Sequence, residues 1–282
     1  VLLIGVPGLA KTLLVETLGK VLGLDAKRIQ FTPDLMPSDI IGSEVLEDSA
    51  GLGQKRSFRF IRGPVFAQLL LADEINRASP KTQSALLQAM QEHHVTVAGR
   101  RYDVPEPFHV LATQNPLEQE GTYPLPEAQL DRFILQIDVG YPDLAAERRM
   151  LHATTGTEER RLETILSPAE LIAMQRLVRQ IPIPDRVVEA ILQMVRSARP
   201  GPKASEDTNR LIAWGPGPRA SQSLMLAVRA KALIDGRFAP SVDDVVALAE
   251  PVLKHRMALT YKARIENREI GEVIAGFAKV LE

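Results

Sequence analysis

Residues 1–12 constrain the fold of this chain more than any other stretch. They begin with an apolar run typical of a short buried strand, pass through a loop with two glycines and a proline, and end with Lys11 and Thr12, where a helix-forming run begins. A strand, a glycine-rich loop and a helix in this order form the phosphate-binding P-loop. Backbone N–H groups and the helix N-terminus converge on an anion in such a loop. The stretch therefore predicts an α/β fold with a phosphate site.

The residue types of this loop suit nucleotide phosphates and a metal ion. Gly5 and Gly8 leave room for backbone N–H groups to converge. Lys11 can reach the β- and γ-phosphates, and the Thr12 hydroxyl can ligate Mg²⁺. Ala10 stands where the pattern has its last glycine, and it fits if the backbone there is already helical. An ordinary strand–helix turn with a solvated lysine is the alternative. We expect the following residues to bind the nucleotide: Gly5, Val6, Pro7, Gly8, Leu9, Ala10, Lys11, Thr12 and Leu13.

A second apolar run, residues 69–72, ends in the adjacent carboxylates Asp73 and Glu74. Ligands of a parallel α/β sheet bind at the carboxyl ends of its strands. We therefore expect Asp73 to face the Mg²⁺ site, directly or through water, and Glu74 to polarise the water that attacks the γ-phosphate. An acidic strand end that caps a helix is the alternative. With the P-loop upstream, the pair predicts hydrolysis of ATP.

Asn115 follows another predicted buried strand, residues 108–113. At that strand end its amide is placed to hold the attacking water or the γ-phosphate. The alternative is a local turn in which the Asn115 side chain bonds the backbone around Pro116.

Two arginines are candidates for contacts with the nucleotide. Arg132, in a predicted helix over residues 127–133, is a candidate arginine finger donated to the γ-phosphate of a neighbouring subunit. A surface ion pair with Asp131 or Glu127 is its alternative. Arg219 opens a later predicted helix and would face the nucleotide if the helical domain closes over the P-loop; otherwise it is an ordinary exposed arginine.

After residues 140–142 the sequence changes from alternating strand and helix patterns to helical patterns only. Two domains are therefore predicted, residues 1–141 and residues 142–282. The second domain shows no convincing strand. In the first, residues 55–61 and 95–104 read as hairpins, and a helix is expected to start at residues 63–64. The basic side chains of the first hairpin either touch a substrate in a pore or form a solvated face. Helical patterns of the second domain cover residues 143–154, 168–180, 184–198, 219–235, 241–257 and 265–281.

Composition narrows the class of protein. The chain has no cysteine, which excludes disulfides, thiolate metal sites and a cysteine nucleophile, and which is consistent with a cytoplasmic location. Its five histidines have no metal-ligand spacing and are expected at the surface or around the site. No apolar run is long enough to cross a membrane. A net charge of −1 weakens the case for nucleic-acid binding. Because the chain begins inside a strand without Met, we expect an upstream segment.

Four stretches together resemble the MoxR family of AAA+ ATPases, and Ala10 resembles that family's own usage. They are residues 5–12, 72–77, 112–116 and 121–133. The resemblance implies a three-layer α/β/α core with a parallel sheet and hairpin insertions near residues 43–62 and 95–105, followed by an all-helical lid domain. It implies a Walker A motif at residues 5–12, a Walker B motif at Asp73 and Glu74, sensor 1 at Asn115, an arginine finger at Arg132 and sensor 2 at Arg219.

The same resemblance implies a hexameric, chaperone-like ATPase that uses ATP and Mg²⁺ to remodel or mature a protein partner, often one with a von Willebrand factor A domain. Two other functions remain open. One is a nucleic-acid motor, which would use Lys55, Arg56, Arg59, Arg100 and Arg101. The other is a nucleotide-dependent binding switch with little turnover, although a pure binder does not need Glu74.

Overall fold

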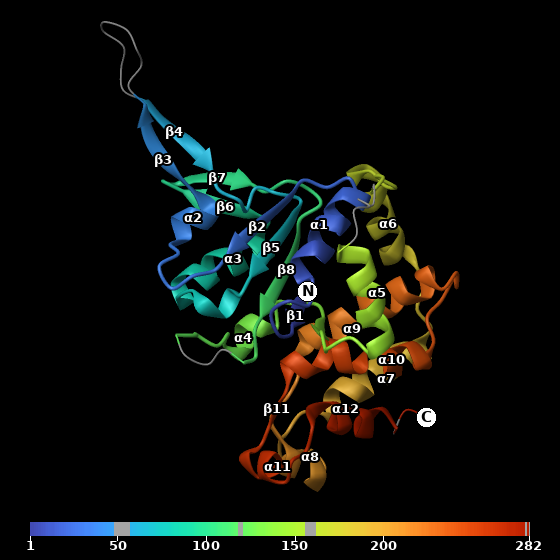
Figure 1. Cartoon of the computed structure of the whole chain (residues 1–282). Helices are drawn as coiled ribbons and strands as arrows, with labels where there is room; N and C mark the ends of the chain where they lie inside the picture. The colour runs from blue at the N-terminus through green and yellow to red at the C-terminus, as the bar shows by residue number, and fades with distance from the viewer. Residues whose placement is uncertain (48–56, 118–120, 156–161, 280, 282) are drawn as a thin grey trace, which may run out of the picture. The chain divides into compact units, whose positions relative to one another are not determined.

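A computed structural model describes residues 1–47, 57–117, 121–155, 162–279 and 281. The chain divides into two compact units, which are described separately (Figure 1). The sheet unit consists of Leu2–Leu125 and Asp138–Ile172, and the helical unit consists of Val1, Pro126–Ile137 and Ala173–Glu282. The division predicted at residues 141 and 142 stays a prediction.

Buried apolar runs build the sheet of the sheet unit. Strand β5 (Leu69–Asp73) is buried at every position, as expected for a central strand covered on both faces. Its neighbours β2 and β8 run parallel to it, with Gln30 of β2 opposite Asp73. This confirms the predicted parallel α/β core. The strand order is β2-β5-β8-β1-β9, with bounds β1 (Leu2–Ile4), β2 (Ala26–Gln30), β8 (His109–Gln114) and β9 (Gln136–Asp138).

Helices cover both sides of this sheet, with α1 and α3 on opposite sides in Figure 1. Helix α1 packs Val15 against Leu69 and Leu71. Helix α3 begins where the Ser79 hydroxyl accepts a hydrogen bond from the Thr82 amide. The helices are α1 (Lys11–Val21), α2 (Pro37–Ile41), the 3-10 turn η1 (Ile75–Arg77), α3 (Pro80–Glu92) and α5 (Leu144–Thr155), while α6 (Pro168–Gln180) crosses into the helical unit.

Two antiparallel hairpins interrupt the α/β core near residues 43–62 and 95–105, where the resemblance implied insertions. The hairpin predicted over residues 55–61 alone is wrong, because residues 57–62 form one strand of the first hairpin. The first pairs β3 (Gly42–Glu47) with β4 (Ser57–Arg62), and the second pairs β6 (His94–Val97) with β7 (Arg100–Asp103). The second turns through Ala98 and Gly99, which both have positive φ, as a two-residue hairpin turn requires. Lys55 and Arg56 lie outside the described residues.

The prediction that a helix starts at residues 63–64 is wrong. The Phe66 amide donates to the Gly63 carbonyl in a turn, and the chain enters β5 at Leu69. The intervening Val65, Phe66 and Ala67 are buried. Because few residues connect β4 to β5, the connecting residues pack as a tight turn.

The helical unit is built around one apolar core. Among its buried members are Ile191 of α7, Leu224 of α9 and Val252 of α10. The helices predicted over residues 184–198 and 219–235 are present, the one predicted over 241–257 ends at Leu253 before a 3-10 turn, and the one predicted over 265–281 is limited to Ile270–Ala278. Helices α8 and α11 and the antiparallel pair β10–β11 were not anticipated. No described helix has the length and apolarity needed to cross a membrane. The elements are α4 (Glu127–Leu130), α7 (Asp185–Ser197), α8 (Glu206–Leu211), β10 (Ile212–Trp214), α9 (Pro218–Ile234), α10 (Val242–Leu253), the 3-10 turn η2 (Lys254–Arg256), β11 (Ala258–Leu259), α11 (Tyr261–Ile265) and α12 (Ile270–Ala278).

Candidate functional site

A pocket of about 450 Å³ lies where helix α1 begins and where strands β2, β5 and β8 end. This is the edge at which parallel α/β sheets bind ligands. Gly5 and Val6, also predicted to bind, do not line it but belong to the same loop. The lining residues are Pro7, Gly8, Leu9, Ala10, Lys11, Thr12, Leu13, Arg28, Gln30, Asp73, Glu74, Thr113 and Asn115.

The Lys11 side chain folds back onto the loop that precedes it. Its Nζ donates to the carbonyl oxygens of Gly5, at 2.5 Å, and Val6, at 3.0 Å. Partial burial lowers the pKa of Lys11, and the nearby carboxylates of Asp73 and Glu74 oppose that shift. The ammonium therefore lines the pocket close to the carboxylates of Asp73 and Glu74.

The backbone of the loop differs from the expectation at Ala10. This residue caps helix α1 with φ of 56°, in the left-handed region and not in the helical one. Alanine is strained there because its Cβ crowds the backbone. Gly8 also has a positive φ, of 85°, whereas Gly5 is required by space: a Cβ there would lie 2.6 Å from the Val139 carbonyl oxygen.

Asp73 is nearly buried, and both of its carboxylate oxygens accept hydrogen bonds. Arg28 donates to Oδ2 from Nη2, at 2.7 Å, and from Nε, at 3.1 Å. The Thr113 hydroxyl donates to Oδ1 at 2.6 Å. Two neighbouring strands thus hold the carboxylate in one orientation.

Glu74 follows β5 in a left-handed conformation, with φ of 55°. Its amide donates to the Thr113 hydroxyl oxygen at 2.8 Å, which fixes the bend. Its Oε2 accepts from Gln30 Nε2 at 2.7 Å and from Arg77 Nη1 at 2.9 Å. Strained backbone that neighbours hold in place is common at functional sites.

Asn115 forms the local turn that the sequence offered as the alternative, and its contact with water or the γ-phosphate stays a prediction. Its Oδ1 accepts a hydrogen bond from the Leu117 amide at 3.1 Å, which is the local turn around Pro116. The residue is also buried and lines the pocket. Because the turn uses the amide oxygen, the Nδ2 group is the donor left for a ligand.

Arg132 and Arg219 belong to the helical unit, so their approach to the pocket stays a prediction. Arg132 is exposed in the turn after α4. Arg219 is the second residue of α9, and its guanidinium lies 3.9 Å from the Asp131 carboxylate.

Three further pocket residues, Arg28, Gln30 and Thr113, were missed in the sequence. Arg28 and Gln30 stand two apart on β2, so they share one face of the strand. Two polar residues at that spacing, at the end of a predicted strand, were the available signal. Thr113 carried no such signal in the sequence, because its contacts with Asp73 and Glu74 depend on β8 lying next to β5.

The donor atoms of this pocket fit Mg²⁺. Thr12 and Asp73 offer a hydroxyl and a carboxylate, which are hard oxygen donors. Within the described part of the chain, no three His, Cys, Asp or Glu side chains converge as a metal cage. Mg²⁺ is usually held by one or two carboxylates together with substrate phosphates, so this donor set suits an ion that arrives with a nucleotide.

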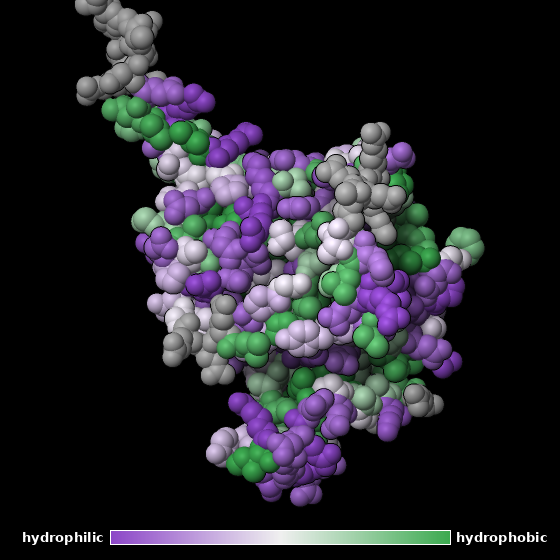
Figure 2. Space-filling model, viewed as in Figure 1, coloured by the Kyte–Doolittle hydropathy of each residue, from purple (hydrophilic) through white to green (hydrophobic). Residues whose placement is uncertain are grey.

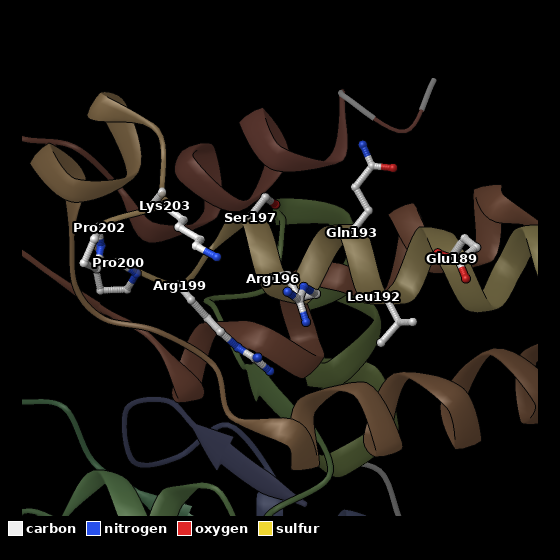
Figure 3. Close-up of a pocket in the computed structure, with 11 residues that line it drawn as sticks. Glu189, Leu192, Gln193, Arg196, Ser197, Arg199, Pro200, Pro202 and Lys203 are labelled. Atoms are coloured by element: carbon white, nitrogen blue, oxygen red, sulfur yellow. The ribbon is translucent and has the colours of Figure 1, made fainter.

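A larger hollow, of about 950 Å³, lies in the helical unit along α7 and the loop after it. Figure 3 shows three cationic side chains extending from this region, Arg196, Arg199 and Lys203. Arg199 already donates to the Pro216 carbonyl at 2.8 Å. None of the predicted site residues line this hollow, and we assign the functional site to the smaller pocket because paired acids, an ammonium and an amide meet there.

Parts of both units match models of known protein families. Residues 1–135 match the model of the ATPase family associated with various cellular activities, and residues 204–275 match that of the AAA lid domain. A solved structure of a candidate ATPase from Cytophaga hutchinsonii superposes with a TM-score of 0.89 at 38% identity, covering 99% of this chain and 83% of the other.

Named relatives agree with these matches. Chaperone MoxR1 of Mycobacterium tuberculosis is 45% identical, over 93% of this chain and 68% of the relative. YeaC of Bacillus subtilis is 42% identical, over 97% of this chain and 82% of the relative. Protein MoxR of Paracoccus denitrificans is 32% identical, over 99% of this chain and 86% of the relative.

Proposed function

This chain belongs to the MoxR family of AAA+ ATPases and is itself an ATPase, and we propose that it couples Mg²⁺-dependent ATP hydrolysis to the remodelling or maturation of a protein partner. The observation that carries the proposal is the meeting of Lys11, Asp73, Glu74 and Asn115 in one pocket. These side chains come from three separate segments of sequence. Together they provide a phosphate grip, a metal ligand, a base and a hydrogen-bond donor.

The P-loop binds the nucleotide in this proposal. Backbone N–H groups of residues 5–13, other than Pro7, surround the phosphates, and Lys11 exchanges the Gly5 and Val6 carbonyls for phosphate oxygens. Thr12 and Asp73 hold Mg²⁺. When bound, the ion neutralises charge that develops on the phosphate oxygens.

Hydrolysis then depends on Glu74 and Asn115. Glu74 accepts a proton from the attacking water, and the Nδ2 group of Asn115 holds that water or the γ-phosphate. Both residues are preset: Thr113 fixes the Glu74 backbone, and the Leu117 amide fixes the Asn115 side chain. Groups that need no reorganisation are the effective ones in electrostatic catalysis.

Arg132 completes the site from a neighbouring subunit of a hexameric ring, and Arg219 contacts the nucleotide when the lid closes. An exposed arginine on a short turn suits a contact made in trans. In the proposed assembly each active site is therefore shared by two subunits.

The first hairpin is the surface we propose for the protein partner, a class that includes proteins with a von Willebrand factor A domain. Figure 2 shows apolar side chains gathered on this hairpin. Val45, Leu46, Phe58 and Ile61 are all exposed there. By the strand register, Leu46 and Phe58 lie opposite each other on one face, and Val45 and Ile61 lie on the other. Exposed apolar patches of this kind mark sites of protein interaction. The relative named Chaperone MoxR1 supports a protein client.

Nucleic acid fits the hairpins less well. Arg59 pairs with Glu47 at 2.8 Å, and Arg101 pairs with Asp103 at 2.8 Å, so these two positive charges each have a carboxylate beside them. Hydrolysis that is stimulated by DNA and falls steeply with salt would favour this alternative instead.

The experiment that tests the proposal is ATP hydrolysis per subunit as a function of protein concentration, with Mg²⁺ and no partner. If Arg132 acts in trans, the specific rate rises as subunits associate and then levels off. A constant rate would remove Arg132 from the mechanism. No turnover at any concentration, with intact nucleotide binding, would favour a binding switch.

A further inference from the structure

Two side chains of one strand hold both acidic residues of the site. Arg28 of β2 donates to Asp73 at 2.7 Å, and Gln30 of the same strand donates to Glu74 at 2.7 Å. Arg28 Nη2 also donates to Gln30 Oε1 at 2.6 Å, so the two are linked to each other. Arg28 therefore neutralises Asp73, and the Gln30 linked to it hydrogen-bonds Glu74, the residue after β5.

This arrangement conflicts with metal binding at Asp73. One carboxylate oxygen accepts two N–H groups of Arg28, and the other accepts the Thr113 hydroxyl. A cation at Oδ2 would meet the guanidinium, a like charge, within a few ångströms. Arg28 has to leave Oδ2 before a metal ion can bind there directly.

Arg28 is the partner that can move. About half of its side chain is exposed (48%), whereas 12% of the Asp73 side chain is. Arg28 also lines the pocket, so a position facing the nucleotide phosphates is within its reach. An arginine is well suited to exchange a carboxylate for a phosphate, since its planar donors match both.

We propose that Arg28 is an exchangeable counter-ion of Asp73, a positioning residue that neutralises this carboxylate when no metal is bound and yields it to Mg²⁺. The inference rests on the proposed Mg²⁺–nucleotide function. It has two consequences of opposite sign. Without Mg²⁺, Arg28 shields the phosphates from Asp73 and strengthens nucleotide binding; with Mg²⁺, Arg28 competes and weakens it.

The test compares the affinity for a fluorescent ADP analogue in excess Mg²⁺ and in EDTA, for the wild type and Arg28→Met. We expect the variant to bind more weakly in EDTA and as tightly or more tightly in Mg²⁺. The ratio of the dissociation constant in EDTA to that in Mg²⁺ should then be about tenfold larger for the variant than for the wild type, a usual size for coupling between two ligands. Lys27→Met is the matched control, because Lys27 is adjacent on β2, bonds the Phe66 carbonyl and lies outside the pocket lining. It should leave the ratio unchanged.

Each other outcome has a definite meaning. Equal weakening in both solutions would make Arg28 a simple phosphate ligand, and two unchanged dissociation constants would give it no role in binding; either overturns the proposal. A wild type that binds no ADP would instead refute the proposed function. If thermal denaturation shows that Arg28→Met does not fold, Arg28→Lys is measured, and its ratio should exceed that of the wild type because one ammonium cannot reproduce the two donors to Oδ2.

Discussion

Arg256 and Asp131 form a buried ion pair in the helical unit, with Arg256 Nε 2.9 Å from Asp131 Oδ1 and only 1% of the arginine side chain exposed. The same guanidinium donates to the Phe133 carbonyl at 2.6 Å and to the Ser223 hydroxyl at 3.0 Å. These contacts grip the chain on both sides of Arg132. A buried arginine thus holds the turn that presents the predicted finger.

Replacing Arg256 with methionine should lower the free energy of unfolding by about 3–5 kcal/mol, because the Asp131 carboxylate and four backbone carbonyls lose their buried partner. Urea denaturation measures the change. Arg210→Met is the control: its pair with Glu266 is partly exposed, so a loss below about 1 kcal/mol is expected. Equal losses in the two variants would contradict the role of burial.

His255, next to Arg256, should make stability depend on pH. Its Nε2 bonds the Phe133 carbonyl, and its Nδ1 is buried without a partner in the described part of the chain. Burial, aided by the charge of Arg256, lowers the pKa of His255 from 6.5 to about 4. The unfolded chain therefore binds one more proton between these values.

Stability should accordingly fall as the pH drops from about 6.5 to about 4, by about 3 kcal/mol from this group. Urea denaturation across that range measures the loss. His255→Gln keeps an N–H donor but does not titrate, so its stability should change less over the same range. Parallel curves for the two proteins would exclude His255 as the cause.

The left-handed backbone at Ala10 predicts a stabilising substitution. Ala10→Gly removes the Cβ strain and is partly offset by greater freedom of the unfolded chain, so the free energy of unfolding should rise by about 0.5–1 kcal/mol. Ala85→Gly, inside helix α3, should instead lower it by about 1 kcal/mol. A loss in both variants would show that Ala10 carries no strain. Chemical denaturation of both variants measures these changes.

The sequence predicted the parts of the site that are local. The P-loop and the pair Asp73–Glu74 each lie within one short stretch whose residue types state their chemistry. The grip of Arg28 on Asp73 could not be predicted, because it requires the register that sets β2 beside β5. For the same reason the buried state of His255 was missed: its partner Phe133 is far away in sequence.

The fold shows a similar limit. Continuous apolar runs such as β5 and periodic helices such as α7 were recognisable, since burial leaves a pattern in the residues themselves. The strands β10 and β11 have three and two residues, too few for any pattern. The expectation of a helical backbone at Ala10 was wrong, because φ at this residue depends on how the loop closes against its surroundings.

Glu74→Gln should separate binding from hydrolysis. The amide keeps the size of the side chain and can still pair with Gln30, but it cannot accept a proton from water, so turnover should fall by at least about 100-fold. Affinity for ATP, measured with a fluorescent analogue, should change little, because the phosphates are held by the P-loop. Glu92→Gln, a carboxylate of α3 outside the pocket lining, is the control and should leave both quantities unchanged. Turnover equal to that of the wild type would mean that Glu74 is not the base.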